Sequence, residues 1–231
     1  MVEKNLHYFN AETFVESTIK LIVEKFQLKL SSTKKKVNIA LSGGSTPIPI
    51  LKELAKHDLN WSQFNFFLVD ERCVPINEKE SNFGNINKVF FSKIKANSFS
   101  VVKENKTYEE CSIAYENLIK EKVEITENGF PIFDLIFLGM GTDGHTASLF
   151  PETKGLNEKN KIVFLNKVPQ LNTSRITFSY PLLFNAKEII VLVSGEDKDE
   201  IIKEIYSNSS NKYPISVIAY QHKNLKWYVS K

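Results

Sequence analysis

The chain has 231 residues, of which 42% are hydrophobic and 25% charged, a composition typical of globular domains and unlike that of disordered or collagen-like sequence. A chain of this length can bury about 70% of the surface that it exposes when unfolded, so it needs no disulfide or structural metal for stability. The 30 basic and 27 acidic residues give a net charge of +3, too even a balance for a dedicated nucleic-acid-binding protein.

Among the basic residues, only Arg72 and Arg175 are arginines. Arginine alone offers a planar, permanently charged group with paired donors for carboxylate or phosphate oxygens. Both are therefore candidate ligand contacts, with structural ion pairs as the alternative explanation. The two cysteines, Cys73 and Cys111, lie in no zinc-ligand spacing, and a reducing compartment is the simplest interpretation.

Targeting and membrane segments are not expected. The N-terminus carries charges where a signal peptide would have an apolar run, and aliphatic stretches such as 189–193 are far shorter than the ~20 residues of a membrane span. The sequence therefore favours a cytoplasmic protein without membrane or nucleic-acid partners, and we expect a monomer or a weak homodimer.

The first predicted elements are a helix followed by a strand–loop–helix unit. Apolar residues recur at steps of three and four over 11–26, which predicts an amphipathic helix with Asn10 as its N-cap. Residues 37–41 are typical of a short buried strand. A glycine turn then leads into a helix with Thr46 as its cap and Pro47 in its first turn.

Strands and helices continue to alternate along the rest of the chain. Residues 65–69 predict a strand and 81–91 a helix, and the capping box of Thr107 and Glu110 opens a helix that runs to about residue 122. Further short apolar runs, which we interpret as strands, alternate with a helical pattern at 197–206; they cover 133–138, 162–165, 176–178, 189–193 and 215–219. This pattern predicts one α/β domain over residues 1–231, with a mostly parallel sheet covered by helices on both faces.

Three loops after predicted strands hold the candidate functional residues, because ligands of open parallel sheets bind at the carboxyl ends of the strands. The first is Ser42-Gly43-Gly44-Ser45-Thr46. Its glycines let the backbone approach an anion closely, and the free amides at the helix start point toward it. The segment lacks the Gly-Lys-Ser/Thr ending of a Walker loop. A phosphate site is the functional interpretation, and a plain glycine turn with a helix cap is the alternative.

The second loop is Asp70-Glu71-Arg72, where a carboxylate and a guanidinium could face one ligand or form a surface ion pair. The third, residues 139–146, formally matches G-x-G-x-x-G. The next predicted strand ends without an acid for a ribose hydroxyl, so we exclude a nicotinamide cofactor. This loop places His145 among glycines, close to Asp143. Because imidazole accepts a proton near neutral pH, we interpret His145 as a general base, with a structural histidine as the alternative.

Taken together, residues 41–47, 69–72 with 81–84, and 138–151 resemble the 6-phosphogluconolactonase family in order and spacing. The resemblance extends from about residue 35 to about residue 200. It implies a Rossmann-like fold shared with sugar-phosphate isomerases and deaminases. It also implies a hydrolase of the oxidative pentose phosphate pathway that opens 6-phospho-D-glucono-1,5-lactone to 6-phospho-D-gluconate with no metal and no cofactor.

The resemblance also implies roles for single residues. His145 would be the general base, Asp143 or Asp70 would orient it, and Arg72 would orient the substrate or stabilise the oxyanion. The residues expected to bind the substrate or its phosphate are Ser42, Gly43, Gly44, Ser45, Thr46, Gly141, Gly144, Arg175 and Lys198.

Two other functions remain as alternatives. Glucosamine-6-phosphate deaminase resembles the chain in the glycine loop, in the acidic pair and in Asp-Gly-His. However, residues 146–150 carry no acid for its proton shuttle, and Arg72 stands where the deaminase has an aromatic residue. A sugar-phosphate sensor without catalysis is the second alternative, although a sensor would not need a base at His145. The sequence therefore favours hydrolysis of the lactone.

Overall fold

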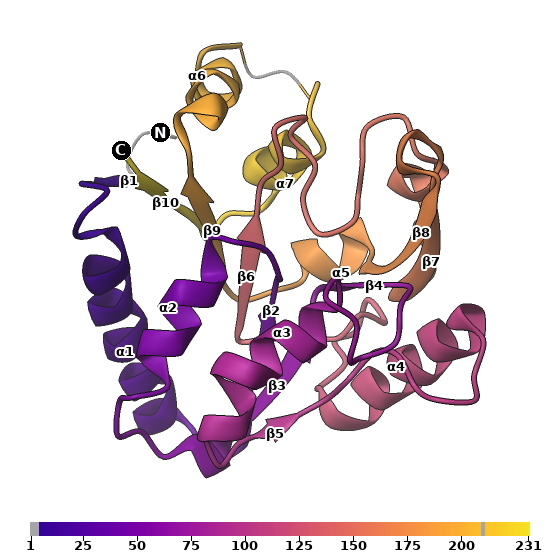
Figure 1. The fold of residues 1–231 in the computed structure, drawn as a ribbon, viewed down its shortest axis with the longest axis horizontal. Helices are drawn as coiled ribbons and strands as arrows, with labels where there is room; N and C mark the ends of the chain where they lie inside the picture. The colour runs from indigo at the N-terminus through magenta and orange to yellow at the C-terminus, as the bar shows by residue number, and fades with distance from the viewer. Residues whose placement is uncertain (1–4, 209–210) are drawn as a thin grey trace.

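Two sheets organise the molecule, which a computed structural model describes over residues 5–208 and 211–231 (Figure 1). In the larger sheet every neighbouring pair of strands is parallel. Its order is β1 (Leu6–Phe9), β10 (Leu225–Ser230), β9 (Ile189–Ser194), β6 (Leu135–Gly139), β2 (Val37–Leu41), β3 (Phe64–Leu68) and β5 (Asn97–Ser98). The smaller sheet is antiparallel, in the order β4 (Asp70–Arg72), β8 (Thr173–Phe178) and β7 (Val163–Val168). The predicted mostly parallel sheet is confirmed.

Helices connect the strands and cover the sheets. They are α1 (Phe14–Ser32), α2 (Pro47–Leu54), α3 (Asn82–Val89), α4 (Tyr108–Lys122), α5 (Tyr180–Phe184), α6 (Asp199–Asn208) and α7 (Pro214–Gln221). Helices α1, α2 and α3 contact one another in that order, and α4 packs against β7. The predicted capping box is present at the start of α4, where Thr107 and Glu110 exchange hydrogen bonds.

Strand β3 illustrates why its sequence is almost continuously apolar. Successive side chains of a strand point to opposite faces. Phe64 and Phe66 pack on Phe26 of α1, with ring centroids 4.9 and 6.5 Å apart. Phe67 lies on the opposite face, 6.4 Å from the ring of Tyr115 in α4. Both faces are therefore covered, as expected for a parallel strand.

Two expectations about the elements are wrong, and the separate antiparallel sheet was not predicted. Residues 215–219, expected as a strand, lie in α7, because a short apolar run fits a buried helix as well as a strand. The runs at 162–165 and 176–178 do belong to strands, but these pair antiparallel with each other in the small sheet. Asn10 precedes the first helix by several residues, and Thr13 occupies the N-cap position.

The terminal strands β1 and β10 were not predicted. They pair with each other and extend the large sheet at one edge, beside β9. The buried apolar side chains form one cluster that includes residues of both sheets. Among the described residues, no helix is both long enough and apolar enough to cross a membrane.

Candidate active site

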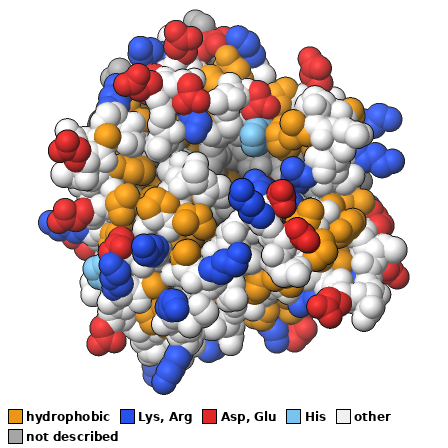
Figure 2. All heavy atoms as spheres, viewed as in Figure 1, with side chains coloured by type: hydrophobic (Ala, Val, Ile, Leu, Met, Phe, Trp, Pro, Cys, Tyr) orange, Lys and Arg blue, Asp and Glu red, His pale blue; other side chains and the backbone are white. Residues whose placement is uncertain are grey.

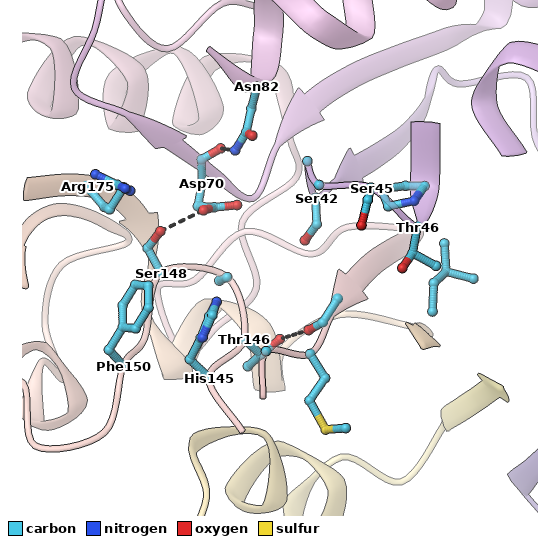
Figure 3. Close-up of a pocket in the computed structure, with 18 of the residues that line it drawn as sticks. Ser42, Ser45, Thr46, Asp70, Asn82, His145, Thr146, Ser148, Phe150 and Arg175 are labelled. Atoms are coloured by element: carbon cyan, nitrogen blue, oxygen red, sulfur yellow. Dashed lines mark hydrogen bonds between the residues drawn. The ribbon is translucent and has the colours of Figure 1, made fainter. Parts of the chain in front are cut away.

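The three predicted loops meet at one cavity of about 280 Å³ at the carboxyl ends of the large sheet's strands. Figure 2 shows this hollow, bordered by basic side chains and a histidine. In Figure 3 the labelled residues of the glycine loop face Asp70, Ser148 and His145 across the cavity. The predicted site residues in its wall are Ser42, Gly43, Gly44, Ser45, Thr46, Asp70, Arg72, Gly141, His145, Arg175 and Lys198. Asp143 and Gly144 do not line the cavity, although they belong to the same loop as His145.

His145 is held mainly by its own loop. Its Nδ1 lies 2.6 Å from Asp143 Oδ1, and its amide donates to the same oxygen at 3.0 Å. The imidazole stacks on the ring of Phe150, with 4.1 Å between centroids. A Cβ on Gly141 would lie 2.2 Å from the imidazole ring, so only glycine fits beside it. These contacts leave Nε2 without a hydrogen-bond partner among the described residues.

The Asp143 carboxylate stays charged beside the histidine. Burial alone would raise its pKa, but the hydrogen bonds from the ring and the amide of His145 outweigh burial and keep the pKa below its usual value. An ionised Asp143 accepts a hydrogen bond from Nδ1–H of His145. This bond favours the imidazole tautomer whose Nε2 carries a free lone pair. Of the two predicted aspartates, Asp143 is the one in contact with His145. Asp70 instead accepts from the hydroxyl of Ser148 at 2.6 Å.

Arg72 and Arg175 lie side by side, because they are register partners in the β4–β8 pair. Arg72 donates to the carbonyl of Glu80, and Arg175 donates to the Thr173 hydroxyl and the Ser174 carbonyl. Burial, and then the charge of Arg72, lowers the pKa of Arg175. Within residues 5–208 and 211–231 neither guanidinium forms an ion pair with a carboxylate. Two adjacent cations of this kind favour an anionic ligand.

Glu71 lies between the cavity residues Asp70 and Arg72, but its side chain contacts the start of α3 and does not line the cavity. Its side chain is buried and accepts from the amides of Arg72, Asn82 and Phe83, at the start of α3. Burial raises the pKa of this carboxyl. The alternation of a strand therefore sends Asp70 and Arg72 to the cavity and Glu71 to the helix cap.

The glycine loop presents backbone and hydroxyl groups to the cavity. Gly44 has a φ of +104°, which favours glycine, and a Cβ on Gly43 would collide with the side chain of Asn82. The hydroxyl of Ser42 is buried and has no partner among the described residues. Thr46 makes no side-chain cap bond to α2. Lys198 also borders the cavity, and its ammonium group donates to the carbonyl of Ser194.

Sequence reasoning missed several cavity residues, namely Asn82, Thr146, Ser148, Phe150 and Leu171. All but Leu171 lie inside the segments that carry the family resemblance, so the segments themselves were the available signal. Among the described residues, no three His, Cys, Asp or Glu side chains come together in a way that could hold a metal ion.

A sequence model of the glucosamine-6-phosphate isomerases/6-phosphogluconolactonase family matches residues 10–227. The chain belongs to this family. Within the family, it is 31% identical to the 6-phosphogluconolactonase of Thermotoga maritima, and the alignment covers all of both chains. It is 34% identical to the 6-phosphogluconolactonase of Haemophilus influenzae, over 98% of this chain and 97% of the relative.

Solved structures of family members share the fold. The crystal structure of 6-phosphogluconolactonase from Thermotoga maritima superimposes with a TM-score of 0.83 at 30% identity, over 98% of this chain and 99% of that one. A 6-phosphogluconolactonase from Shewanella baltica gives a TM-score of 0.87 at 22% identity, over 98% and 97% of the two chains, which speaks for the fold alone. The predicted Rossmann-like α/β fold is confirmed.

Proposed function

We propose that this protein hydrolyses 6-phospho-D-glucono-1,5-lactone to 6-phospho-D-gluconate, the ring-opening step of the oxidative pentose phosphate pathway, with His145 as general base. One observation carries the proposal. An imidazole with a free Nε2 and two guanidiniums free of carboxylate partners line the same cavity, among the described residues. The family relatives are 6-phosphogluconolactonases, which supports the same substrate.

The substrate phosphate is assigned to the part of the cavity that is lined by cationic side chains and the glycine loop. Arg175, Lys198 and the glycine loop would hold the phosphate, and Arg72, beside Arg175, would orient the rest of the substrate. The buried Ser42 hydroxyl, unpartnered among the described residues, is available to a substrate oxygen. Binding energy from the phosphate then fixes the lactone carbonyl in front of His145, which converts a bimolecular reaction into a positioned one.

The chemistry needs one base and no covalent intermediate, because a lactone is an activated ester. His145 Nε2 takes a proton from water as the water oxygen bonds to the carbonyl carbon C1. The bond between C1 and the ring oxygen then breaks, and the imidazolium returns its proton to that oxygen. The Asp143 carboxylate stabilises the imidazolium through Nδ1–H. The new carboxylic acid loses its proton to solvent.

The test compares the wild-type protein with the His145→Ala variant on 6-phosphogluconolactone. We expect the variant to lose about 10²- to 10⁴-fold in kcat, the usual contribution of a general base, and to bind 6-phosphogluconate nearly as tightly as wild type. His57→Ala, a change at an exposed histidine outside the cavity, is the matched control.

Glucosamine-6-phosphate is the second substrate in the same assay. Wild-type turnover of this compound in place of the lactone would favour a deaminase. Tight binding of 6-phosphogluconate without turnover of either substrate would favour a sensor. A His145→Ala variant with near-full activity would show that the assigned base is wrong.

A further inference from the structure

Ser148, three residues after His145, connects the histidine loop to all three strands of the small sheet. Its amide donates to Thr177 Oγ1 in β8 at 3.1 Å, and its hydroxyl donates to Asp70 Oδ2 in β4 at 2.6 Å. Its carbonyl accepts from Asn166 Nδ2 in β7 at 2.9 Å. The residue is only 2% exposed, so each of these bonds is shielded from water. We call Thr177, Asp70 and Asn166 the three anchor residues.

The anchor residues lie on the same face of the small sheet as the two arginines. Arg72 is the register partner of Arg175, which is in turn the partner of Asn166. Asp70 and Thr177 are partners two residues further along the same strands. Residues two apart on a strand, and residues directly opposite across a pair, share one face. The face of the small sheet that binds Ser148 therefore also carries Arg72 and Arg175, which line the cavity.

Between His145 and the small sheet, the residues on either side of Ala147 are both fixed by hydrogen bonds. Thr146 donates to the carbonyl of Gly139 in β6 at 2.8 Å, which ties it to the large sheet. Ala147 has a φ of +51°, in the left-handed region that non-glycine residues rarely adopt. Such a conformation persists where neighbouring contacts determine it, and here the neighbours are the two bonded residues Thr146 and Ser148.

We propose that Ser148 is a positioning residue that sets the placement of His145 relative to Arg72 and Arg175. The inference rests on the proposed function, in which the arginine side of the cavity holds the substrate and His145 activates the water. Figure 3 shows Ser148 between Asp70 and the loop that carries His145. An error of about 1 Å between a bound substrate and its catalytic group can reduce the rate about 100-fold. The bonds of Ser148 prevent such an error without touching the reacting atoms.

Two variants test the role of Ser148. Ser148→Ala removes the donor to Asp70, and Thr177→Val removes the acceptor for the Ser148 amide at nearly constant volume. We expect each to lower kcat about 10- to 100-fold while KM changes less than about threefold, because the arginines keep their strand pairing. Thr177→Ser, which keeps the acceptor oxygen, should restore most of kcat. The double variant should lose less than the product of the two single losses, since both changes release the same loop.

Controls separate positioning from general destabilisation. Ser112→Ala in α4 and Thr18→Val in α1 make the same chemical changes at buried sites away from the cavity, and should leave kcat unchanged. Wild-type kcat in both Ser148→Ala and Thr177→Val would overturn the inference, as would equal losses in the Ser112 and Thr18 controls or no rescue by Thr177→Ser. A wild-type protein without lactonase activity overturns the proposed function, and this inference with it.

Discussion

His145 is positioned largely by residues next to it in the chain, whereas the two arginines are positioned by the pairing of β4 with β8. Asp143, Gly141 and Phe150 all lie within five residues of His145. The contacts that hold the proposed base therefore come mostly from one short segment. The positions of Arg72 and Arg175 depend on two strands that are distant in sequence, so any change that shifts the register of these strands would separate the two cations.

Arg175→Lys tests the proposed contact between Arg175 and the substrate phosphate. A lysine keeps a charge but loses the planar pair of donors, so we expect KM for the lactone to rise about tenfold while kcat changes little. The inhibition constant of inorganic phosphate should rise in parallel. An unchanged KM would contradict a phosphate role for Arg175.

The same variant should also acquire a dependence on alkaline pH. Burial and the neighbouring Arg72 lower the pKa of the cation at this place. An arginine stays protonated regardless, but a lysine, with an ordinary pKa of about 10.4, would lose its proton at a lower pH there. The KM of the variant should therefore rise further at a pH below that at which an ordinary lysine titrates, where the wild-type KM stays flat.

At the scale of elements, Glu188 connects α1 to the amino ends of β9 and β10, which lie at the end of the large sheet opposite the cavity. Its carboxylate lies just before β9, 2.5 Å from Lys25 Nζ and 3.7 Å from Lys29 Nζ, both in α1, and 3.4 Å from Lys226 Nζ in β10. Burial would raise the pKa of Glu188, but the hydrogen bond and charge of Lys25 and the charges of the other two lysines lower it. This carboxylate therefore holds a helix against two strands.

Glu188→Gln should cost about 3 kcal/mol of unfolding free energy at pH 7, because it leaves three ammonium groups close together without a counter-charge. The folded pKa lies below the unfolded value of about 4.3, so the stabilisation is complete above that value and is lost as pH falls through the folded pKa. Urea unfolding of both proteins at pH 7 and near pH 3 measures the difference, which should shrink at the lower pH. The control Glu121→Gln, at an exposed pair with Lys122, should cost less than about 0.5 kcal/mol.

The elements also show where sequence reasoning reached its limit. The loops after β2, β3 and β6 could be predicted to meet, because parallel strands bring their carboxyl ends to one edge of a sheet. The pairing of β4 with β8 could not, since nothing in three residues such as Asp70-Glu71-Arg72 specifies a distant partner. Residues 215–219 form a helix that periodicity could not distinguish from a strand, although Pro214 at its first position was a helix-start signal. The contacts of Ser148 depend on three such distant strands and could not be predicted from the sequence either.

At the scale of the whole molecule, the cavity is a junction between the two sheets. The glycine loop and His145 come from the large sheet, whereas Arg72 and Arg175 come from the small one. A phosphorylated ligand in this cavity would contact both sheets at once. Its binding should therefore stabilise the entire fold rather than one loop.

Thermal unfolding with 6-phosphogluconate tests this coupling. A ligand that binds only the folded state contributes about 2.7 kcal/mol at 100 times its Kd, and for a chain of this size that corresponds to a rise in Tm of about 5–10 °C. Gluconate, which lacks the phosphate, should give a much smaller rise at the same concentration. Arg175→Ala should abolish most of the 6-phosphogluconate effect, because it removes the guanidinium assigned to the phosphate and leaves only Lys198 and the glycine loop to hold that group. A full Tm rise in that variant would mean that the phosphate binds elsewhere, and the assignment of the phosphate to Arg175 would be wrong.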